Sequence, residues 1–132
     1  MSHTVKIAAQ FKTENLESFK RAIEHFGWKL VENTRIRTYS SDSARNTVYP
    51  MIAQNPNHGY DLGIQFNEAT GELEVYGDFF DGSVARTLGQ GIDKLKQEYT
   101  CCVAEDYFAF HGYTATREVM EDGKIAVVGE LC

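Results

Sequence analysis

The sequence lacks the features typical of a membrane or secreted protein. No apolar run approaches the roughly 18 residues that cross a bilayer, and the N-terminal residues contain no apolar segment typical of a signal peptide. Cysteine is scarce, with three residues and no C-x-x-C spacing, so neither a disulfide framework nor a zinc site is expected. These absences predict a cytoplasmic protein with reduced thiols, and they point to no metal and no other cofactor.

Proline is also scarce, with two residues, whereas aromatic side chains make up 12% and apolar side chains 42% of the chain. This composition is typical of a packed core and not of a disordered tail or linker. The length of 132 residues suits one domain. We therefore expect residues 1–132 to fold as a single domain.

The chain has few basic residues. It contains 13 basic and 19 acidic residues, which gives a net charge of −6. Residues 1–50 hold eight basic and five acidic side chains, whereas residues 51–132 hold five basic and fourteen acidic ones. An acidic protein repels nucleic acid at long range. A nucleic-acid partner is therefore not expected.

A small basic group is nevertheless present before residue 50. Arg35, Arg37 and Arg45 fall within eleven residues. Together with Arg117 they are candidates for binding a small phosphorylated or nucleotide-like ligand through charge-assisted hydrogen bonds. The alternative is a solvated loop between strands, and no glycine-rich phosphate-binding motif accompanies the arginines.

Hydropathy patterns predict a mixture of strands and helices. Alternation of apolar and polar residues favours strands, whereas an apolar residue at every third or fourth position favours helices. The predicted strands are residues 4–11, 29–31, 35–39, 47–53, 60–66, 72–77, 113–120 and 124–130, and the predicted helices are residues 15–26, 84–99 and 100–111. This order predicts an α+β fold, in which two to three helices pack on an antiparallel or mixed β-sheet.

Five residues mark boundaries within this pattern. Asn15 is a candidate N-cap of the first helix, and Gly27 is expected to end it. Pro50 would place its strand at an edge or a bulge of the sheet. Gly89 and Gly91 interrupt the second helical pattern, so either the helix breaks there or another element packs closely against it.

Carboxylates before the second helix are the candidates for catalysis. Asp78 and Asp81 lie where a strand ends and a helix begins, and with Arg86 they could form the site of a small acid/base enzyme. The simpler interpretation is that these carboxylates cap the helix by accepting hydrogen bonds from its free N–H groups. The sequence contains no G-x-S-x-G and no H-E-x-x-H motif, so no catalytic residue is assigned.

The C-terminal third has more apolar side chains than a single helix face or a buried strand needs. One helix face cannot bury all three aromatic side chains of Tyr107, Phe108 and Phe110. This predicts either a second core layer that covers the remainder or an exposed interface. Ile125 and Val127 belong to an apolar strand near the end of the chain, and an unpaired edge of this kind invites another strand. We therefore expect a homo-oligomer, with a different protein partner as the alternative.

Two adjacent cysteines, Cys101 and Cys102, lie in the third predicted helix. Their sequence neighbours include no Lys or Arg, and Glu98 and Glu105 are expected to raise the pKa values of the thiols. Burial of one of the two, Cys102, on a helix face is the favoured interpretation, and a vicinal redox pair is the alternative.

Several short motifs are spread over the chain. They are Met1-Ser2-His3, Tyr60-Asp61-Leu62-Gly63, Asp78-Phe79-Phe80, Leu95-x-Gln97-x-Tyr99, Gly112-Tyr113, Arg117-Glu118 and Asp122-Gly123-Lys124-Ile125. Through these motifs the sequence resembles the ycf thirty-five family of plastids, cyanobacteria, other bacteria and some phages, a domain of unknown function.

This resemblance covers nearly the whole chain and implies a helix over residues 100–111, but it supplies no catalytic residues or substrate. It also implies the plastid stroma or a host cytoplasm as possible locations. Family members commonly end on a Trp, whereas this chain ends on Cys132.

These observations leave three functions open. The favoured one is a non-catalytic binding or adaptor protein that acts through self-association or a protein partner. The second is a protein that binds or sequesters a small phosphorylated or nucleotide-like ligand through its arginines. The third is a small acid/base enzyme that uses Asp78 and Asp81.

Overall fold

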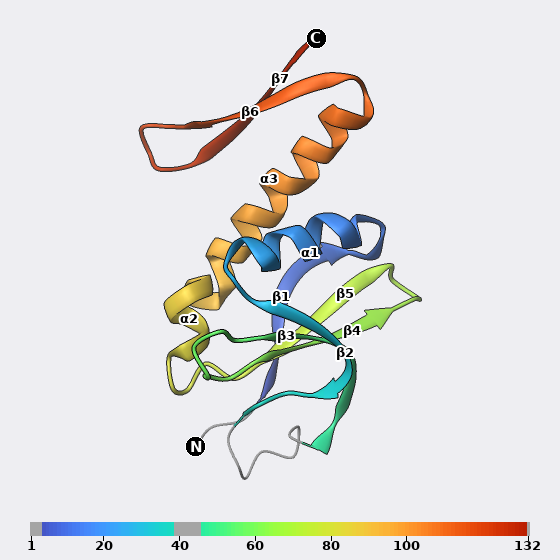
Figure 1. Cartoon of the computed structure of the whole chain (residues 1–132), viewed down its shortest axis with the longest axis vertical. Coiled ribbons are helices and arrows are strands. Elements are labelled where there is room, and N and C mark those ends of the chain that lie inside the picture. The colour runs from blue at the N-terminus through green and yellow to red at the C-terminus, as the bar shows by residue number, and fades with distance from the viewer. Residues whose placement is uncertain (1–3, 39–45, 132) are drawn as a thin grey trace.

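A five-stranded antiparallel sheet forms the body of the protein (Figure 1). The structure is a computed structural model and describes residues 4–38 and 46–131. The strands lie in the order β1-β5-β4-β3-β2, with β1 at one edge and β2 at the other. Their bounds are β1 (Val5–Lys12), β2 (Lys29–Arg35), β3 (Val48–Gln54), β4 (Leu62–Asn67) and β5 (Glu72–Gly77).

Three helices complete the body. The first, α1 (Leu16–His25), follows a short 3-10 turn, and α2 (Ser83–Leu88) precedes the long α3 (Asp93–Phe110). The helices α1 and α3 pack against each other, and α3 continues beyond the sheet (Figure 1). The predicted α+β class is therefore confirmed. No helix among the described residues has the length and apolar character needed to cross a membrane.

The core lies between the helices and one face of the sheet, and a smaller cluster covers the opposite face. The apolar stripe predicted for the first helix lies in this core, with Phe19 and Ile23 buried and Leu16 and Phe26 partly buried, because its spacing of three and four residues places those side chains on one side. Members of the core include Phe19, Ile23, Leu62, Ile64, Val75, Leu88 and Leu95, and the opposite face carries Ile36, Tyr49 and Ile52.

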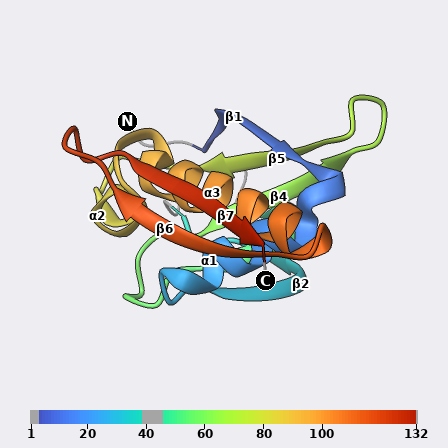
Figure 2. The ribbon, with the colours of Figure 1, turned by 90° about the horizontal axis from the view of Figure 1, so that it is seen from above.

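The remaining strands, β6 (Tyr113–Val119) and β7 (Ile125–Leu131), form a separate antiparallel hairpin. This hairpin lies over the C-terminal part of α3, away from the five-stranded sheet (Figures 1 and 2). Gly123 has φ +85° in the connecting loop, a conformation that glycine adopts without strain. The predicted hairpin and its glycine turn are both confirmed.

The helix boundaries follow the predicted glycines. Gly27 has φ +79° directly after α1, and Gly112 has φ +81° directly after α3. Between α2 and α3, Gly89 has φ +85° and Ile92 has φ +57°, so the second helical pattern does break. The helix predicted over residues 100–111 is confirmed as the second half of α3.

Two expectations about local structure hold only in part. Asn15 is the N-cap residue of α1 by position, but its side chain makes no cap hydrogen bond, and its amide donates to the Tyr99 hydroxyl at 3.3 Å. Pro50 lies in β3, which is an interior strand and not an edge. The sheet accepts this proline because pairing of β3 with β4 begins at Met51, and because Pro50 and Asn33 are not paired in the ladder between β3 and β2. Neither ladder therefore needs the N–H that proline lacks.

Residues 29–39 also differ from the prediction of two short strands. They contain one continuous strand, β2, which ends at Arg35. Residues 36–38 have no strand assignment, and Tyr39 lies outside the described residues.

We predict that Asp61→Ala destabilises the body. Asp61 is buried and accepts hydrogen bonds from the main-chain N–H of Arg37 at 2.7 Å, from the Arg37 guanidinium, and from the N–H of Asn55 at 2.8 Å. Its loss leaves these donors without their acceptor, so the free energy of unfolding should fall by about 2–4 kcal/mol. Chemical denaturation measures this, and exposed Glu68→Ala serves as the control, with an expected change below about 0.5 kcal/mol. Equal losses in the two variants would contradict the prediction.

Candidate functional site

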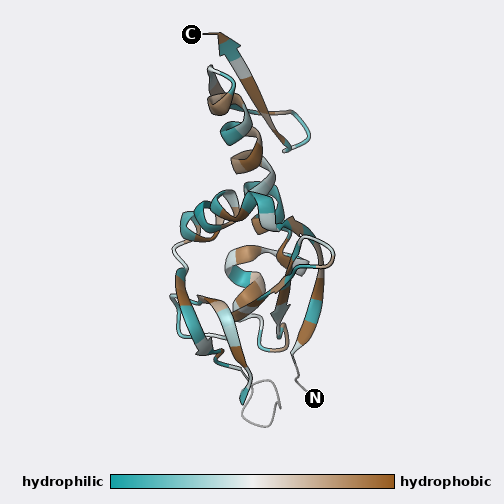
Figure 3. Ribbon diagram, turned by 90° about the vertical axis from the view of Figure 1, so that its right-hand side faces the viewer, coloured by the Kyte–Doolittle hydropathy of each residue, from teal (hydrophilic) through white to brown (hydrophobic). Residues whose placement is uncertain are grey.

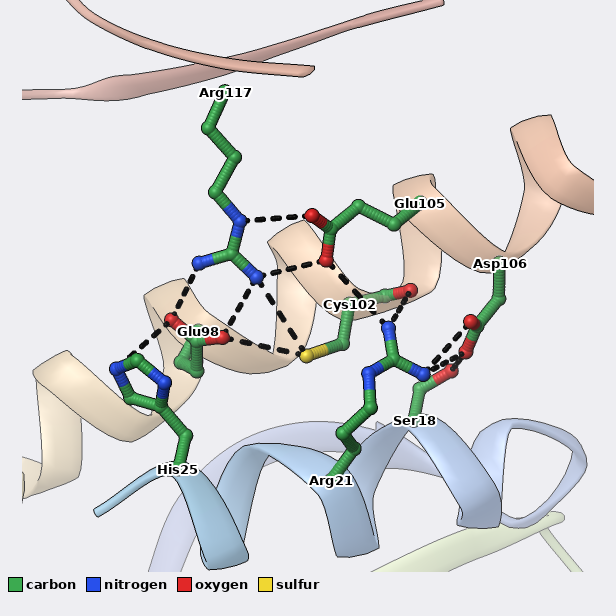
Figure 4. Close-up of polar contacts among 8 residues, drawn as sticks. All are labelled: Ser18, Arg21, His25, Glu98, Cys102, Glu105, Asp106 and Arg117. Carbon is green, nitrogen blue, oxygen red and sulfur yellow. Dashed lines mark hydrogen bonds and ion pairs between the residues drawn. The ribbon is translucent and has the colours of Figure 1, made fainter. Parts of the chain in front are cut away.

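One arginine fastens the C-terminal hairpin to α3. Arg117 of β6 donates from Nη1 and Nη2 to the two oxygens of Glu98, at 2.8 and 2.7 Å (Figure 4). It also donates from Nε and Nη2 to Glu105, at 3.0 and 2.8 Å. The two glutamates are seven residues apart on α3, and two helical turns place them on the same face. The guanidinium therefore bridges β6 to two successive positions along the helix.

These ion pairs differ from ordinary surface pairs because one carboxylate is buried. The side chain of Glu98 is 8% exposed and that of Arg117 is 29% exposed. The hydrogen bonds from Arg117 lower the pKa of Glu98, although burial opposes this, and Cys102 and His25 lower it further. Arg117 likewise lowers the pKa of Glu105. Both carboxylates are therefore ionised at neutral pH.

A second arginine joins α1 to the same side of α3. Arg21 binds Asp106 at 2.7 Å, lies 3.5 Å from Glu105, and donates to the main-chain carbonyl of Cys102 at 3.2 Å. The hydroxyl of Ser18 donates to Asp106 (Figure 4). One stretch of α3 thus holds both α1 and the hairpin by charge-assisted hydrogen bonds.

The two cysteines of α3 are free and buried beside this network. Burial raises the pKa of both thiols, that of Cys102 to about 11. The expected burial and the expected direction of the shift are confirmed. The expectation that no Lys or Arg lies nearby is wrong, because Nη2 of Arg117 is 3.9 Å from the Cys102 sulfur and Arg21 reaches the carbonyl of the same residue. A buried, protonated thiol is a poor nucleophile, so this geometry does not favour the redox alternative.

Apolar side chains are exposed around the hairpin and the end of α3. We call this set the C-terminal surface: it comprises Tyr107, Phe110, Tyr113, Val119, Met120 and Leu131. The described part of the chain has ten exposed large apolar side chains, and these six all lie within residues 107–131. Phe110 is 85% exposed, Leu131 79% and Val119 77%. The exposed aromatic residues predicted from the sequence are therefore present at Tyr107 and Phe110.

The hairpin is wider than the helix that covers it. The ring of Phe108 lies against Gly129, where an added Cβ would be 2.4 Å from the ring, and Arg117 points to α3 on the same side of the sheet. Because alternate residues share a face, Ile125, Val127 and Leu131 also lie on the side of β7 that faces α3. Ile125 and Val127 stay partly exposed and Leu131 is largely exposed, so the edges of this face extend beyond the helix.

The four candidate arginines are not brought together. Arg37 binds Asp61 beside the five-stranded sheet, whereas Arg117 lies on the hairpin at the other end of the molecule (Figure 1). Arg35 is the exposed last residue of β2, and Arg45 lies outside the described residues.

The candidate acid/base residues hold the chain as it enters α2. Asp78 accepts the N–H of Phe80 at 2.9 Å, and Asp81 accepts the N–H of Ser83 at 2.8 Å. Arg86 donates to the main-chain carbonyl of Asp81 at 3.2 Å and not to either carboxylate. Asp81 therefore caps the first N–H of α2, as the simpler interpretation predicted, whereas Asp78 binds an N–H of the turn before the helix. Within residues 4–38 and 46–131, no group of His, Cys, Asp and Glu is arranged to hold a metal ion.

Sequence reasoning missed Glu98 and Glu105 as the partners of Arg117. It treated them only as acidic neighbours of the cysteines. Their spacing of two helical turns was the available signal, since it predicts a two-carboxylate face able to hold one guanidinium.

The chain matches no known protein family, no curated protein and no solved structure. The resemblance to the ycf thirty-five family therefore stays a prediction. Two residues of its motifs form ion pairs within the body or between hairpin and helix: Asp61 binds Arg37, and Arg117 binds Glu98.

We predict that Arg117→Met weakens the attachment of the hairpin. The variant leaves the buried Glu98 carboxylate without its main partner, and the unfolding free energy at pH 7 should fall by about 1–3 kcal/mol, less than for a fully buried pair because Arg117 is partly exposed. Lys6→Met is the matched control: it removes the exposed 2.7 Å pair with Glu74 and should destabilise the protein less than Arg117→Met does, because solvent screens an exposed pair.

The difference between wild type and Arg117→Met should depend on pH. The folded-state pKa values of Glu98 and Glu105 are lowered, so the stability that they contribute is present above the pKa of an unfolded glutamate, about 4.3. It is lost as the pH falls through the lowered values. Denaturation curves from pH 7 to pH 3 should therefore converge for the two proteins. A difference that stays constant across this range would rule out the ion pairs as its source.

Proposed function

We propose that this protein is a non-catalytic binding protein, an adaptor, that acts by self-association through the C-terminal surface. The observation that supports the proposal most directly is the concentration of exposed apolar side chains in residues 107–131. Single exposed apolar residues are normal, but large groups of them mark interaction sites. Four of the six are aromatic or sulfur-containing, the types enriched at interfaces: Tyr107, Phe110, Tyr113 and Met120.

The attachment of the hairpin also favours a binding role. Arg117 holds β6 against α3 through two carboxylates, and Phe108 packs on Gly129 of β7. A surface that is already fixed in position loses little conformational entropy when a partner binds. Apolar segments of the hairpin and of α3 lie together at this end of the molecule (Figure 3).

The other two functions have less support. A phosphate group at Arg37 or Arg117 would have to displace carboxylates that already bind these side chains. An acid/base site would need Asp78 and Asp81 free of the main-chain hydrogen bonds that they accept. We place the protein in the cytoplasm, as expected from its few cysteines, and the two cysteines among the described residues are free thiols.

The proposal predicts that Phe110→Ser abolishes or weakens self-association. Native mass spectrometry and light scattering of the wild type should give a multiple of 14.9 kDa. The variant should associate at least about tenfold more weakly, as expected when an interface aromatic is truncated. Phe80→Ser is the matched control, because Phe80 is also exposed, at 70%, but lies outside residues 107–131; its assembly should equal that of the wild type.

Two results would contradict the proposal. One is a wild-type protein that stays monomeric at all accessible concentrations. The other is an equal loss of association in Phe80→Ser and Phe110→Ser. A discrete mass excess that disappears on denaturation would instead identify a bound small ligand and favour the second function.

A further inference from the structure

We propose that two copies of the chain join through β7, which pairs antiparallel with β7 of the second copy. The two hairpins then form one four-stranded sheet in the order β6-β7-β7′-β6′, where the prime marks the second copy. A twofold axis passes through Val128, the middle residue of β7 (Ile125–Leu131). This inference rests on the proposed self-association and states which surface carries it.

The free edges of the hairpin motivate the proposal. Among the described residues, β6 and β7 pair only with each other, and a two-stranded sheet is marginally stable in water unless further strands or a helix support it. The middle of β6 carries Glu118, a charge that discourages pairing, whereas β7 carries no charge from Ile125 to Gly129 and its one charge, Glu130, lies near its end. The unprotected edge is therefore β7.

The proposed register gathers the apolar residues that one copy leaves exposed. With Val128 on the axis, Ile125 lies opposite Leu131 of the second copy. Within each hairpin, Val119 pairs with Ile125 and Tyr113 pairs with Leu131. On the face toward α3, four apolar side chains therefore lie in a row across the four strands: Val119 and Ile125 of one copy, then Leu131 and Tyr113 of the second copy. The twofold axis generates a second, identical row.

This row includes three of the six members of the C-terminal surface, Tyr113, Val119 and Leu131. Cross-strand apolar pairs are the unit by which sheets gain stability. The two hairpins would also leave room for both α3 helices on one face. Strands about 4.8 Å apart place the centres of the two hairpins about 10 Å apart, which is the distance between packed helices. The α3 helices of both copies lie on that face, because a twofold axis perpendicular to the sheet keeps each residue on its own side.

Charge supports the same arrangement. On the face away from α3, Glu130 lies opposite Ala126 of the second copy, and Lys124 of the second copy is its diagonal neighbour. Diagonal side chains in an antiparallel pair are about 7–8 Å apart, within reach of a lysine and a glutamate. The symmetric interface contains this pair twice, as an isologous contact requires.

A cysteine on the twofold axis tests the register. In a Cys132→Ser background, Val128→Cys places two thiols opposite each other at the 4.5–5.5 Å Cα separation of antiparallel partners, which suits a disulfide. We expect mild oxidation to give a cross-linked dimer. Thr116→Cys is the control, since Thr116 pairs with Val128 on the same face but lies on β6, about three strand spacings from its counterpart; it should not cross-link.

A charge exchange provides a second measurement that needs no oxidation. Val128→Arg and Val128→Glu each place like charges in contact on the axis, so each variant alone should be monomeric. An equimolar mixture should recover the dimer, because the two opposite charges then face each other. The side chain of Val128 lies on the face away from α3, so neither substitution enters the packing between hairpin and helix.

The outcomes separate the two proposals. A wild-type dimer in which Val128→Cys does not cross-link faster than Thr116→Cys, and in which the Arg and Glu variants do not recover on mixing, would overturn the β7 interface and leave self-association standing. A wild type that is monomeric throughout would overturn both.

Discussion

The Arg117 guanidinium holds the C-terminal hairpin on α3 by hydrogen bonds to two carboxylates of that helix. The hairpin has little else to fix it, because it pairs with no strand of the five-stranded sheet and only part of one face rests on α3. The ion pairs with Glu98 and Glu105 therefore set where the exposed apolar residues are presented. Since the same stretch of α3 binds Arg21 of α1, the position of the hairpin is linked to the body.

The length of α3 explains why this end of the molecule is exposed. Its first half is buried in the core through Leu95 and Tyr99, whereas its last turns carry Tyr107 and Phe110 into solvent. A helix and a two-stranded hairpin cannot enclose a core of ordinary size by themselves. Pairing with a second hairpin would supply further strands and cover the apolar edges, which is why we propose self-association in preference to a ligand or a reaction.

Local patterns were sufficient for much of this structure. The alternation over residues 60–66 and 72–77 predicted the β4–β5 hairpin, and Gly27, Gly89 and Gly123 marked helix ends and a turn because their backbones need positive φ. Features that depend on distant residues were not predictable in this way. Pro50 lies in an interior strand because of the register of both neighbouring ladders, and no local pattern reports that register.

The candidate site was likewise predictable from local sequence only in part. Counting the aromatic residues against one helix face left a second core layer and an exposed interface both open, and the structure shows Tyr107 and Phe110 exposed. The partners of Arg117 did not follow from local sequence, because Glu98 and Glu105 are 19 and 12 residues away on another element. The four arginines looked similar in sequence, yet tertiary structure gives Arg37 and Arg117 separate carboxylate partners.

Hydrogen exchange measured at several protein concentrations tests the central claim most directly. If a second copy covers the edge of β7, the amides of residues 125–131 should exchange more slowly as concentration rises through the association range. Those of residues 62–77, in the body of the sheet, should not change. Exchange in β7 that is independent of concentration, in a protein that does associate, would contradict the account.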